Sequence, residues 1–304
     1  MDNVNDRRYI HEKMAVQLHG HDKLYAKYIP QIPPSAEREY AKVSAEYMMI
    51  VKEVLESELP AIKEIYRRER EANVRTDSKE DLITAITTVF DRMQVKVANR
   101  CEAFGLRRKL ENLANLTRKL TVKEWKKAIR ATLGIDIRDD YYLGDFYREA
   151  LEAWVDENVS LIKTIPTDSL GRMKSIIEEG YTSGRTTTKM VRQIQAAYGT
   201  SKRHATLIAR DQIAKLNGNI QKAQQQDAGI TEYKWCTCGD GRVRSSHRRL
   251  NGKVFKWSDP PVTDDGRKCH PGEDYQCRCI ARPVFNRNTV NLPLKEGTVK
   301  IGYR

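Results

Sequence analysis

The sequence has 304 residues, of which 31% are charged and 39% hydrophobic, and its formal net charge at pH 7 is +13. This length is enough for two domains with separate cores. No apolar stretch is long enough for a membrane-spanning helix, and none follows the charged N-terminal residues as it would in a signal peptide. We therefore expect folding in a reducing cytoplasm, where cysteines become metal ligands or free thiols more readily than disulfides.

The first part of the chain is predicted to form long helices. From Ser35 onward, apolar residues recur every three or four positions and mark one face of a helix, which Pro60 is expected to interrupt. Ser78 and Asp81 resemble a capping box, in which side chains bond the free backbone N–H groups of a helix start. They predict the beginning of a second helix.

Shorter helices are predicted to follow. Thr121 begins another capping pattern, and Gly134 is expected to end the helix that it opens. Pro166 is expected to stop the next helix, while Gly180 and Gly199 are expected to separate the short helices after it. No heptad repeat is sustained, so the pattern favours a helical bundle over an extended coiled coil.

The pattern changes beyond residue 229. Tyr233–Trp235 and Val254–Trp257 are predicted strands, and Asn251-Gly252 predicts a hairpin turn because both residues tolerate positive φ. We therefore predict a mainly α-helical protein, a bundle with a small C-terminal α+β subdomain that contains a β-hairpin. This subdomain is polar and rich in Gly and Pro, so a zinc ion that staples it would supply folding energy.

The charges are unevenly distributed along the chain. Residues 1–184 carry 31 basic and 31 acidic side chains, whereas residues 185–222 carry eight basic side chains and one acidic. Residues 231–304 carry fifteen basic and eight acidic side chains. A neutral first half and a basic second half suggest that the first meets protein and the second meets polyphosphate. The alternative is a solvated cationic face without a ligand.

Five of the six cysteines lie within 44 residues in two groups, 236–238 and 269–279, and His247 lies between the groups. Paired thiols that face an imidazole are the donor set that zinc prefers. The candidate metal ligands are Cys236, Cys238, His247, Cys269, Cys277 and Cys279.

The spacing of these thiols leaves three outcomes open. The two close pairs, Cys236 with Cys238 and Cys277 with Cys279, are both Cys-x-Cys, whereas most structural zinc sites have a longer gap between paired cysteines. In a strand, the two side chains of Cys-x-Cys leave the same face, which also suits a disulfide or a cross-strand contact. The cluster is therefore a structural zinc site, a disulfide, or a set of buried free thiols. Cys101 lies outside it and is expected to be a small core residue.

Short motifs follow one another in a fixed order between residues 150 and 285. They are Asn158–Pro166, Gly199–Ser201, Ala205, Ile208–Asp211, Ala228–Ile230, Trp235, Asp240–Arg244, His247, Leu250–Gly252 and Cys277–Cys279. Their order and spacing resemble the tailed-phage head-morphogenesis family typified by the F protein of phage Mu. The resemblance covers close to half of the chain.

This chain departs from the family pattern in two places. Arg210 and Asp211 stand where the family commonly has a Thr-Glu dyad. Of the candidate metal ligands, only His247, Cys277 and Cys279 fall within the shared motifs. A zinc site therefore depends partly on residues particular to this chain.

The resemblance implies a minor capsid protein without catalytic residues. Such a protein is present in a few copies at the portal vertex inside the procapsid, assists head assembly and touches the packaged genome. The implied partners are the portal protein, the major capsid or scaffolding protein, and double-stranded DNA bound without sequence specificity, with no membrane. The implied location is the interior of the virion head, after assembly in the host cytoplasm.

This resemblance also suggests a domain organisation. We expect residues 1–150 to be a helical portal-interacting region and residues 151–285 to be the head-morphogenesis domain. Within that domain we expect helices over 151–228 and the β-rich cysteine cluster over 229–285. Residues 286–304 are expected to form a C-terminal tail.

Six basic residues are the candidate contacts to DNA. They are Arg242, Arg244, Arg248, Arg249, Lys202 and Arg203. Arginine binds either phosphate or a neighbouring carboxylate, so Arg242 and Arg244 could pair with Asp240 instead. Two alternative functions remain open: a small metal-dependent nuclease that uses His247 near a metal, and a basic cytoplasmic DNA-binding protein.

Overall fold

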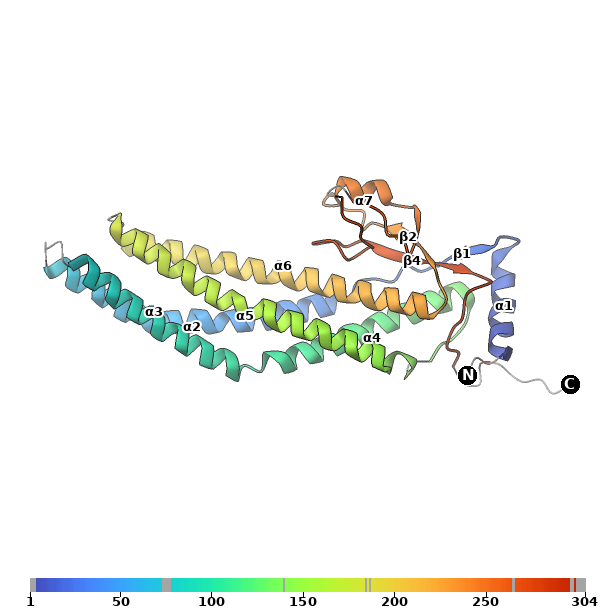
Figure 1. Ribbon diagram of the computed structural model, residues 1–304, viewed down its shortest axis with the longest axis horizontal. Helices are drawn as coiled ribbons and strands as arrows, with labels where there is room; N and C mark the ends of the chain where they lie inside the picture. Colours follow the sequence, from blue (N-terminus) through green and yellow to red (C-terminus); the bar gives the residue numbers. More distant parts are fainter. Residues whose placement is uncertain are drawn as a thin grey trace. The chain divides into compact units, whose positions relative to one another are not determined.

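The fold is described by a computed structural model that covers residues 4–72, 78–138, 140–183, 185, 187–263, 266–295 and 298. Its α-helices are α1 (Val4–Leu18), α2 (Pro34–Ala72), α3 (Ser78–Ala103), α4 (Leu106–Leu133), α5 (Asp145–Thr182), α6 (Thr187–Asp227) and α7 (Ser245–Leu250) (Figure 1). Its strands are β1 (Lys23–Tyr25), β2 (Glu232–Cys236), β3 (Val254–Lys256) and β4 (Ile280–Asn286), and a 3-10 turn, η1 (Asp140–Leu143), precedes α5. The predicted class, mainly α with a small C-terminal α+β part, is confirmed.

The chain divides into two compact units that do not follow sequence order. The sheet unit comprises the described residues of Met1–Glu37, Leu113–Trp154 and Arg210–Arg304. The helical unit comprises Arg38–Asn112 and Val155–Ala209. Each unit therefore draws on both sides of residue 150, and the expected domain boundaries at 150 and 285 stay predictions.

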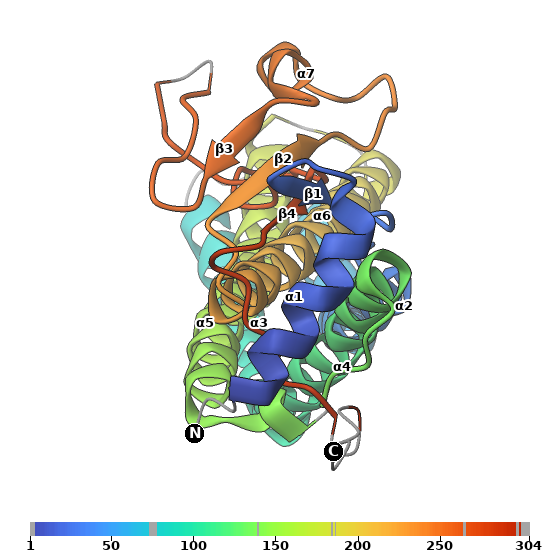
Figure 2. The same cartoon turned by 90° about the vertical axis from the view of Figure 1, so that its right-hand side faces the viewer.

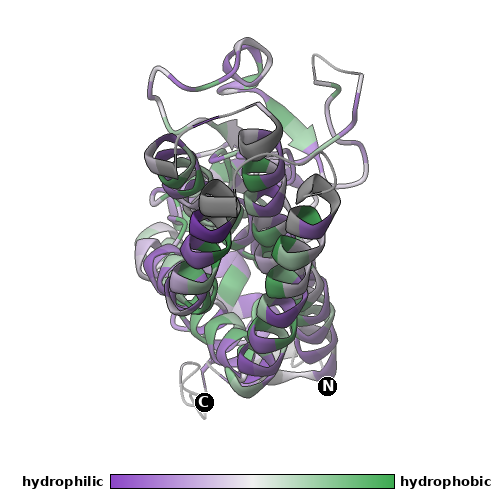
Figure 3. Ribbon diagram, turned by 90° about the vertical axis from the view of Figure 1, so that its left-hand side faces the viewer, coloured by the Kyte–Doolittle hydropathy of each residue, from purple (hydrophilic) through white to green (hydrophobic). Residues whose placement is uncertain are grey.

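The helical unit is built from amphipathic segments of long helices. In α2 the predicted apolar stripe is buried, and Tyr40 at its start donates a hydrogen bond of 2.6 Å to the Asn158 side chain of α5. Further along, the buried Glu58 of α2 pairs with Arg92 and Lys96 of α3. Figure 3 shows helices with hydrophobic residues on one side and hydrophilic residues on the other.

The sheet unit contains a four-stranded antiparallel sheet in the order β1-β4-β2-β3. The central strand β4 pairs Ala281 with Trp235 of β2 and Phe285 with Leu24 of β1. Strands from near both ends of the chain therefore share one sheet. Figure 2 shows this sheet beside the C-terminal half of α6, where the Gln225 side chain donates a hydrogen bond of 2.9 Å to the Ala281 carbonyl.

Two adjacent cores hold the sheet unit together. The larger one joins α1, α4, the end of α6 and β4, and the rings of Trp125 and Phe285 stack within it. The smaller one combines side chains of β2 and β4 with others next to β3 and β4, and it consists of Tyr233, Trp235, Trp257, Cys277, Cys279 and Ala281. Two of the clustered cysteines are thus part of an aromatic core.

Several predicted helix ends are wrong. Pro60 lies inside α2 and Pro166 inside α5, and α6 runs through Gly199. A proline inside a helix costs about 3 kcal/mol, but buried neighbours such as Ile62 and Ile165 keep the helices continuous through packing. The end at Gly134 is confirmed, since α4 stops at the preceding residue and Gly134 has φ +68°.

Thr121 does not begin a helix. It lies inside α4, where its hydroxyl is 2.8 Å from the Thr117 carbonyl and 3.0 Å from the Asn217 side chain of α6. A threonine hydroxyl can bond a carbonyl one helical turn earlier as well as a free N–H at a helix start. The capping pattern alone does not separate these two uses.

The predicted strands are confirmed, but the turn between them is different. β2 and β3 pair antiparallel, and α7 lies in the connection between them. Asn251 and Gly252 join α7 to β3, and Gly252 has φ +81° with its N–H bonded to the Trp235 carbonyl. The predicted turn at Asn251-Gly252 is therefore present, but it joins a helix to a strand and does not join two strands. None of the described helices is long and apolar enough to cross a membrane.

Candidate metal centre

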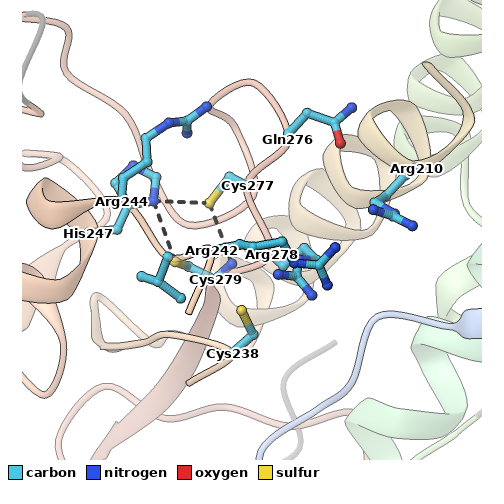
Figure 4. Close-up of a pocket in the computed structure, with 10 residues that line it drawn as sticks. Arg210, Cys238, Arg242, Arg244, His247, Gln276, Cys277, Arg278 and Cys279 are labelled. Atoms are coloured by element: carbon cyan, nitrogen blue, oxygen red, sulfur yellow. Dashed lines mark hydrogen bonds between the residues drawn. The ribbon is translucent and has the colours of Figure 1, made fainter. Parts of the chain in front are cut away.

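One histidine and two cysteines meet inside the sheet unit. His247 comes from α7, while Cys277 and Cys279 come from the segment that leads into β4. The Nδ1 atom of His247 lies 3.6 Å from the Sγ atom of Cys277 and 3.6 Å from that of Cys279 (Figure 4). One ligand atom from each residue lies within 4.8 Å of the other two. All three side chains are buried.

Close backbone packing places the cysteine segment. Gly272 has φ +90°, and a Cβ at this position would lie 3.3 Å from the Ala214 carbonyl of α6. A Cβ at Gly218 would lie 3.3 Å from the Pro271 carbonyl. The two glycines let the turn approach α6 closely, and this approach sets where the chain continues to Cys277.

The other ring nitrogen of His247 is bound by a carboxylate. Nε2 lies 3.2 Å from Oδ2 of Asp274. Oδ2 also accepts a hydrogen bond of 2.9 Å from Arg244, and Oδ1 accepts one of 2.8 Å from Arg267. Because an ionised carboxylate only accepts, Nε2 carries the proton, and the lone pair of Nδ1 faces the two sulfurs. Metal-binding histidines usually have their other ring nitrogen bound to a carboxylate in this way.

Hydrogen bonds favour one ionised sulfur in the pair. The pKa of Cys277 is lowered to about 5, because the Cys279 thiol donates a hydrogen bond to its sulfur and the His247 ring lies against it. The backbone N–H groups of Gly272 and Cys279 also point at this sulfur, each at 3.4 Å. The pKa of Cys279 is raised, because its thiol donates to Cys277 and is buried. The hydrogen bond with Cys277 raises the pKa of His247.

The distances match a tetrahedral zinc site. Zinc binds cysteine sulfur at about 2.3 Å and histidine nitrogen at about 2.0–2.1 Å, so tetrahedral angles place nitrogen and sulfur ligands about 3.6 Å apart. Both nitrogen–sulfur separations around His247 have this value, 3.6 Å. The donor atoms, their separations and the carboxylate that orients His247 therefore all fit zinc.

A thiol, an imidazole and a carboxylate in series also occur in cysteine hydrolases. In those enzymes one thiol faces the histidine. Here Cys277 and Cys279 lie at the same distance from Nδ1, and both are almost fully buried. This symmetry suits a shared metal ion better than a single nucleophile.

The other three predicted ligands do not belong to this group of three. Cys238 is exposed and lines the same pocket as His247, Cys277 and Cys279. Cys236 lies on β2 next to the buried Trp235, whose ring contacts His247, so alternation along the strand directs Cys236 to the opposite face. Cys269 is buried, and burial raises its pKa to about 11.

Most of the predicted DNA-binding residues have partners within the protein. Arg242 pairs with Asp240 at 3.2 Å, and Arg244 pairs with Asp274 as described above. Arg248 of α7 donates a hydrogen bond to the carbonyl of Val243, which lies in the segment before this helix.

The remaining DNA-binding candidates differ in place. Arg249 also lies on α7, and Arg203 lies on α6 in the helical unit, where it donates to the Thr200 hydroxyl. The side chain of Lys202 lies outside the described residues. The six candidates therefore come from two different units.

Sequence reasoning missed three residues of the site. Asp274 orients the histidine, and Arg210 and Arg278 line the pocket beside the sulfurs. A carboxylate three residues before Cys277 was the available signal for Asp274. Arg210 is 37 residues before His247 in the sequence, and only the fold brings α6 to the site.

Comparisons with known proteins agree with the motif resemblance. Residues 172–282 match the family model described as phage Mu protein F like protein. An uncharacterized protein of Haemophilus influenzae is 34% identical over 140 residues, which are 46% of this chain and 30% of that relative. The chain thus matches less than a third of the length of this curated relative, and no solved structure matches it. The predicted resemblance is confirmed over residues 172–282.

Proposed function

We propose that this protein is a non-catalytic component of a phage head, bound at the portal vertex inside the procapsid. The observation that carries this proposal is the match of residues 172–282 to the phage Mu F-like family. The test is a pull-down of the tagged full chain from an infected or prophage-induced lysate. Portal and capsid or scaffolding subunits should co-purify with it, and their absence would contradict the proposal.

We assign the portal contact to residues 1–150. Large apolar side chains are exposed in this range, among them Met49 on α2 and Val95 on α3, which are 48% and 60% exposed. A contiguous patch of exposed apolar side chains favours binding to another protein, and we propose that Met49 and Val95 belong to such a patch. The full-length variant Met49→Glu/Val95→Glu should enter procapsids poorly. Leu207→Glu, which changes an exposed leucine outside this range, is the control and should enter normally.

The proposed DNA contact is supported by a basic stripe on α4. Lys119, Lys123, Lys126 and Arg130 recur every three or four residues and so share one helix face, about 16 Å long. All four line a groove of about 810 Å³. Lys119 and Lys123 have no partner among the residues that the structure describes. The stripe offers positive charge to phosphates and carries no base-reading scaffold.

This contact predicts a specific salt dependence. Each neutralised phosphate contributes a slope of about −0.9 to log affinity against log salt. The variant Lys119→Ala/Lys123→Ala should therefore flatten the slope by about 2, equally for two duplexes of unrelated sequence, in fluorescence anisotropy. Lys42→Ala/Lys163→Ala removes two exposed lysines of the helical unit and should leave the slope unchanged. Equal slopes for both variants would remove α4 from the DNA contact.

We also propose that the cofactor is structural zinc, held by His247, Cys277 and Cys279. Cys238 lines the same pocket and is the candidate for the fourth position. Zinc supplies folding energy to small domains that bury little apolar surface. The proposal is tested by elemental analysis of the purified chain together with a thiol count under denaturing conditions. If the protein contains no zinc and fewer than six free thiols, the cysteines form disulfides. If it contains no zinc and all six thiols are free, the cluster is a set of packed free thiols.

A further inference from the structure

A pocket of about 140 Å³ opens beside the two sulfurs and is lined by four arginines (Figure 4). These arginines are Arg210, Arg242, Arg244 and Arg278. Arg210 comes from α6, two others come from the segment between β2 and α7, and Arg278 lies between the two cysteines. Arginines from three separate segments thus line one small space.

Part of this positive charge is neutralised by Asp240. Its carboxylate accepts from both Arg242 and Arg278, and these hydrogen bonds lower the pKa of Asp240 to about 2. Glu37 also acts on Arg278 electrostatically. Arg210, by contrast, has no hydrogen-bond or ion-pair partner within the described part of the chain.

Asp274 neutralises only part of the positive charge that Asp240 and Glu37 leave at the pocket. It is shared by Arg244 and Arg267, and it is 4% exposed. Around the pocket there are then five guanidinium groups and three carboxylates, which leaves a surplus of two positive charges. A zinc ion with two thiolates would be neutral, and a third thiolate from Cys238 would still leave one positive charge unmatched.

The surplus and the shape both indicate a small anion. Sites for drug-sized ligands have volumes of about 300–1,000 Å³, so this pocket is too small for a whole nucleotide. Several guanidinium groups that surround one point form bidentate hydrogen bonds with phosphate oxygens. We propose that this pocket binds a phosphate group, with Arg210 as the arginine that is free to engage it.

The phosphate could come from either of two sources, and the pocket chemistry is the same for both. If the phosphate belongs to the DNA backbone, this inference rests on the proposed DNA contact. If it is free phosphate, the inference does not depend on that contact. In either case Arg210 would bind phosphate beside the metal ligands without being one of them. It would therefore affect phosphate affinity and leave metal content unchanged.

The first experiment titrates the full-length protein with inorganic phosphate by calorimetry, at an ionic strength held constant with chloride. Wild type should bind, and phosphate should raise its melting temperature. Arg210→Gln should weaken phosphate binding about tenfold or more, because it removes charge-assisted hydrogen bonds. Arg192→Gln, which changes an exposed arginine elsewhere on α6, is the matched control and should bind as wild type does.

Two further measurements make the outcome decisive. Circular dichroism and metal content should be the same for both variants, and Arg210→Lys should restore part of the affinity by restoring the charge. Absence of phosphate binding by wild type, or equal binding by Arg210→Gln and Arg192→Gln, would overturn the proposal.

The source is identified by competition with a short DNA duplex. If a backbone phosphate occupies the pocket, the duplex should displace inorganic phosphate, and Arg210→Gln should weaken the duplex as well. If inorganic phosphate binds and the duplex does not compete, the pocket takes free phosphate, and the DNA contact proposed for α4 is judged separately by its own variants.

Discussion

The Nε2 atom of His247 lies 3.2 Å from the Oδ2 atom of Asp274, so the ring is oriented with Nδ1 toward two sulfurs. Asp274 is itself fixed by two guanidinium groups and is 4% exposed. The histidine is thereby held in one tautomer and one orientation by Asp274 and the two arginines that bind it. This arrangement gives the ring the fixed orientation that is usual for a metal-binding histidine.

The first prediction concerns that orienting carboxylate. Asp274→Asn should weaken zinc binding about 10–100-fold, because the amide is a poorer acceptor for the Nε2 proton. Competition with a colorimetric chelator measures the affinity. Asp259→Asn is the matched control, since Asp259 is 73% exposed and pairs with Lys268 away from the site. Equal affinities for the two variants would contradict the assigned role of Asp274.

The second prediction separates the cysteines. Cys277→Ser should abolish zinc binding, and Cys238→Ser should weaken it. Cys236→Ser should keep full zinc content, because Cys236 lies on the opposite face of β2. Elemental analysis per protein chain gives the result. Zinc loss from Cys236→Ser equal to that from Cys277→Ser would disprove the proposed ligand set.

The third prediction concerns pH and the helical unit. Hydrogen bonds from Arg92 and Lys96 lower the pKa of Glu58 below its ordinary value of 4.5. Glu58 therefore binds a proton less readily in the folded state than in the unfolded state. Its ion pairs with Arg92 and Lys96 stabilise the protein above about pH 4.5, and this stabilisation is lost as the pH falls below that value. Glu58→Gln should lower the free energy of unfolding at pH 7 by about 1–2 kcal/mol.

Chemical denaturation of wild type and Glu58→Gln between pH 3 and pH 7 measures this difference. It should shrink as the pH decreases through the acidic range. A difference that stays constant with pH would show that the loss comes from packing and not from charge. Glu56→Gln changes an exposed glutamate of α2 and serves as the control.

The fourth prediction compares two glycines that end helices. Gly229 follows α6 with φ +69°, and a Cβ there would lie 1.9 Å from the Thr289 carbonyl oxygen. Gly134 follows α4 with φ +68°, and nothing lies within 4 Å of a Cβ at that position. Gly229→Ala should therefore destabilise the protein by about 1–3 kcal/mol more than Gly134→Ala, since only the first variant adds a clash to the same backbone strain.

Thermal or chemical unfolding of the two variants gives the comparison directly. Similar losses for both would mean that the Thr289 backbone moves away at little cost. The close approach of this segment to the end of α6 would then be unimportant for stability.

The helical elements were the most predictable part of the fold. The apolar stripe from Ser35 and the glycine at 134 report local properties, namely which face is buried and which residue accepts positive φ. Pro60, Pro166 and Gly199 misled the prediction because local preference is small next to the packing of a long helix. Helix positions were therefore predicted better than helix lengths.

The candidate site was predictable in composition and not in arrangement. The residues that could bind a metal were evident from their donor atoms alone, and three of the six meet in the structure. Cys236 and Cys269 could not be separated from His247, Cys277 and Cys279 by spacing, because strand alternation and the close packing of Gly272 on α6 decide which side chains converge.

The sequence by itself determined the helical class, the family resemblance and the donor chemistry of the cysteine cluster, because each depends on residue type and short-range order. Tertiary structure alone decided that Asp274 orients His247 and that Arg210 of α6 reaches the pocket of the sulfurs. It also decided that β1, from the start of the chain, pairs with β4. These relations join residues far apart in sequence, and only the burial of shared cores brings them together.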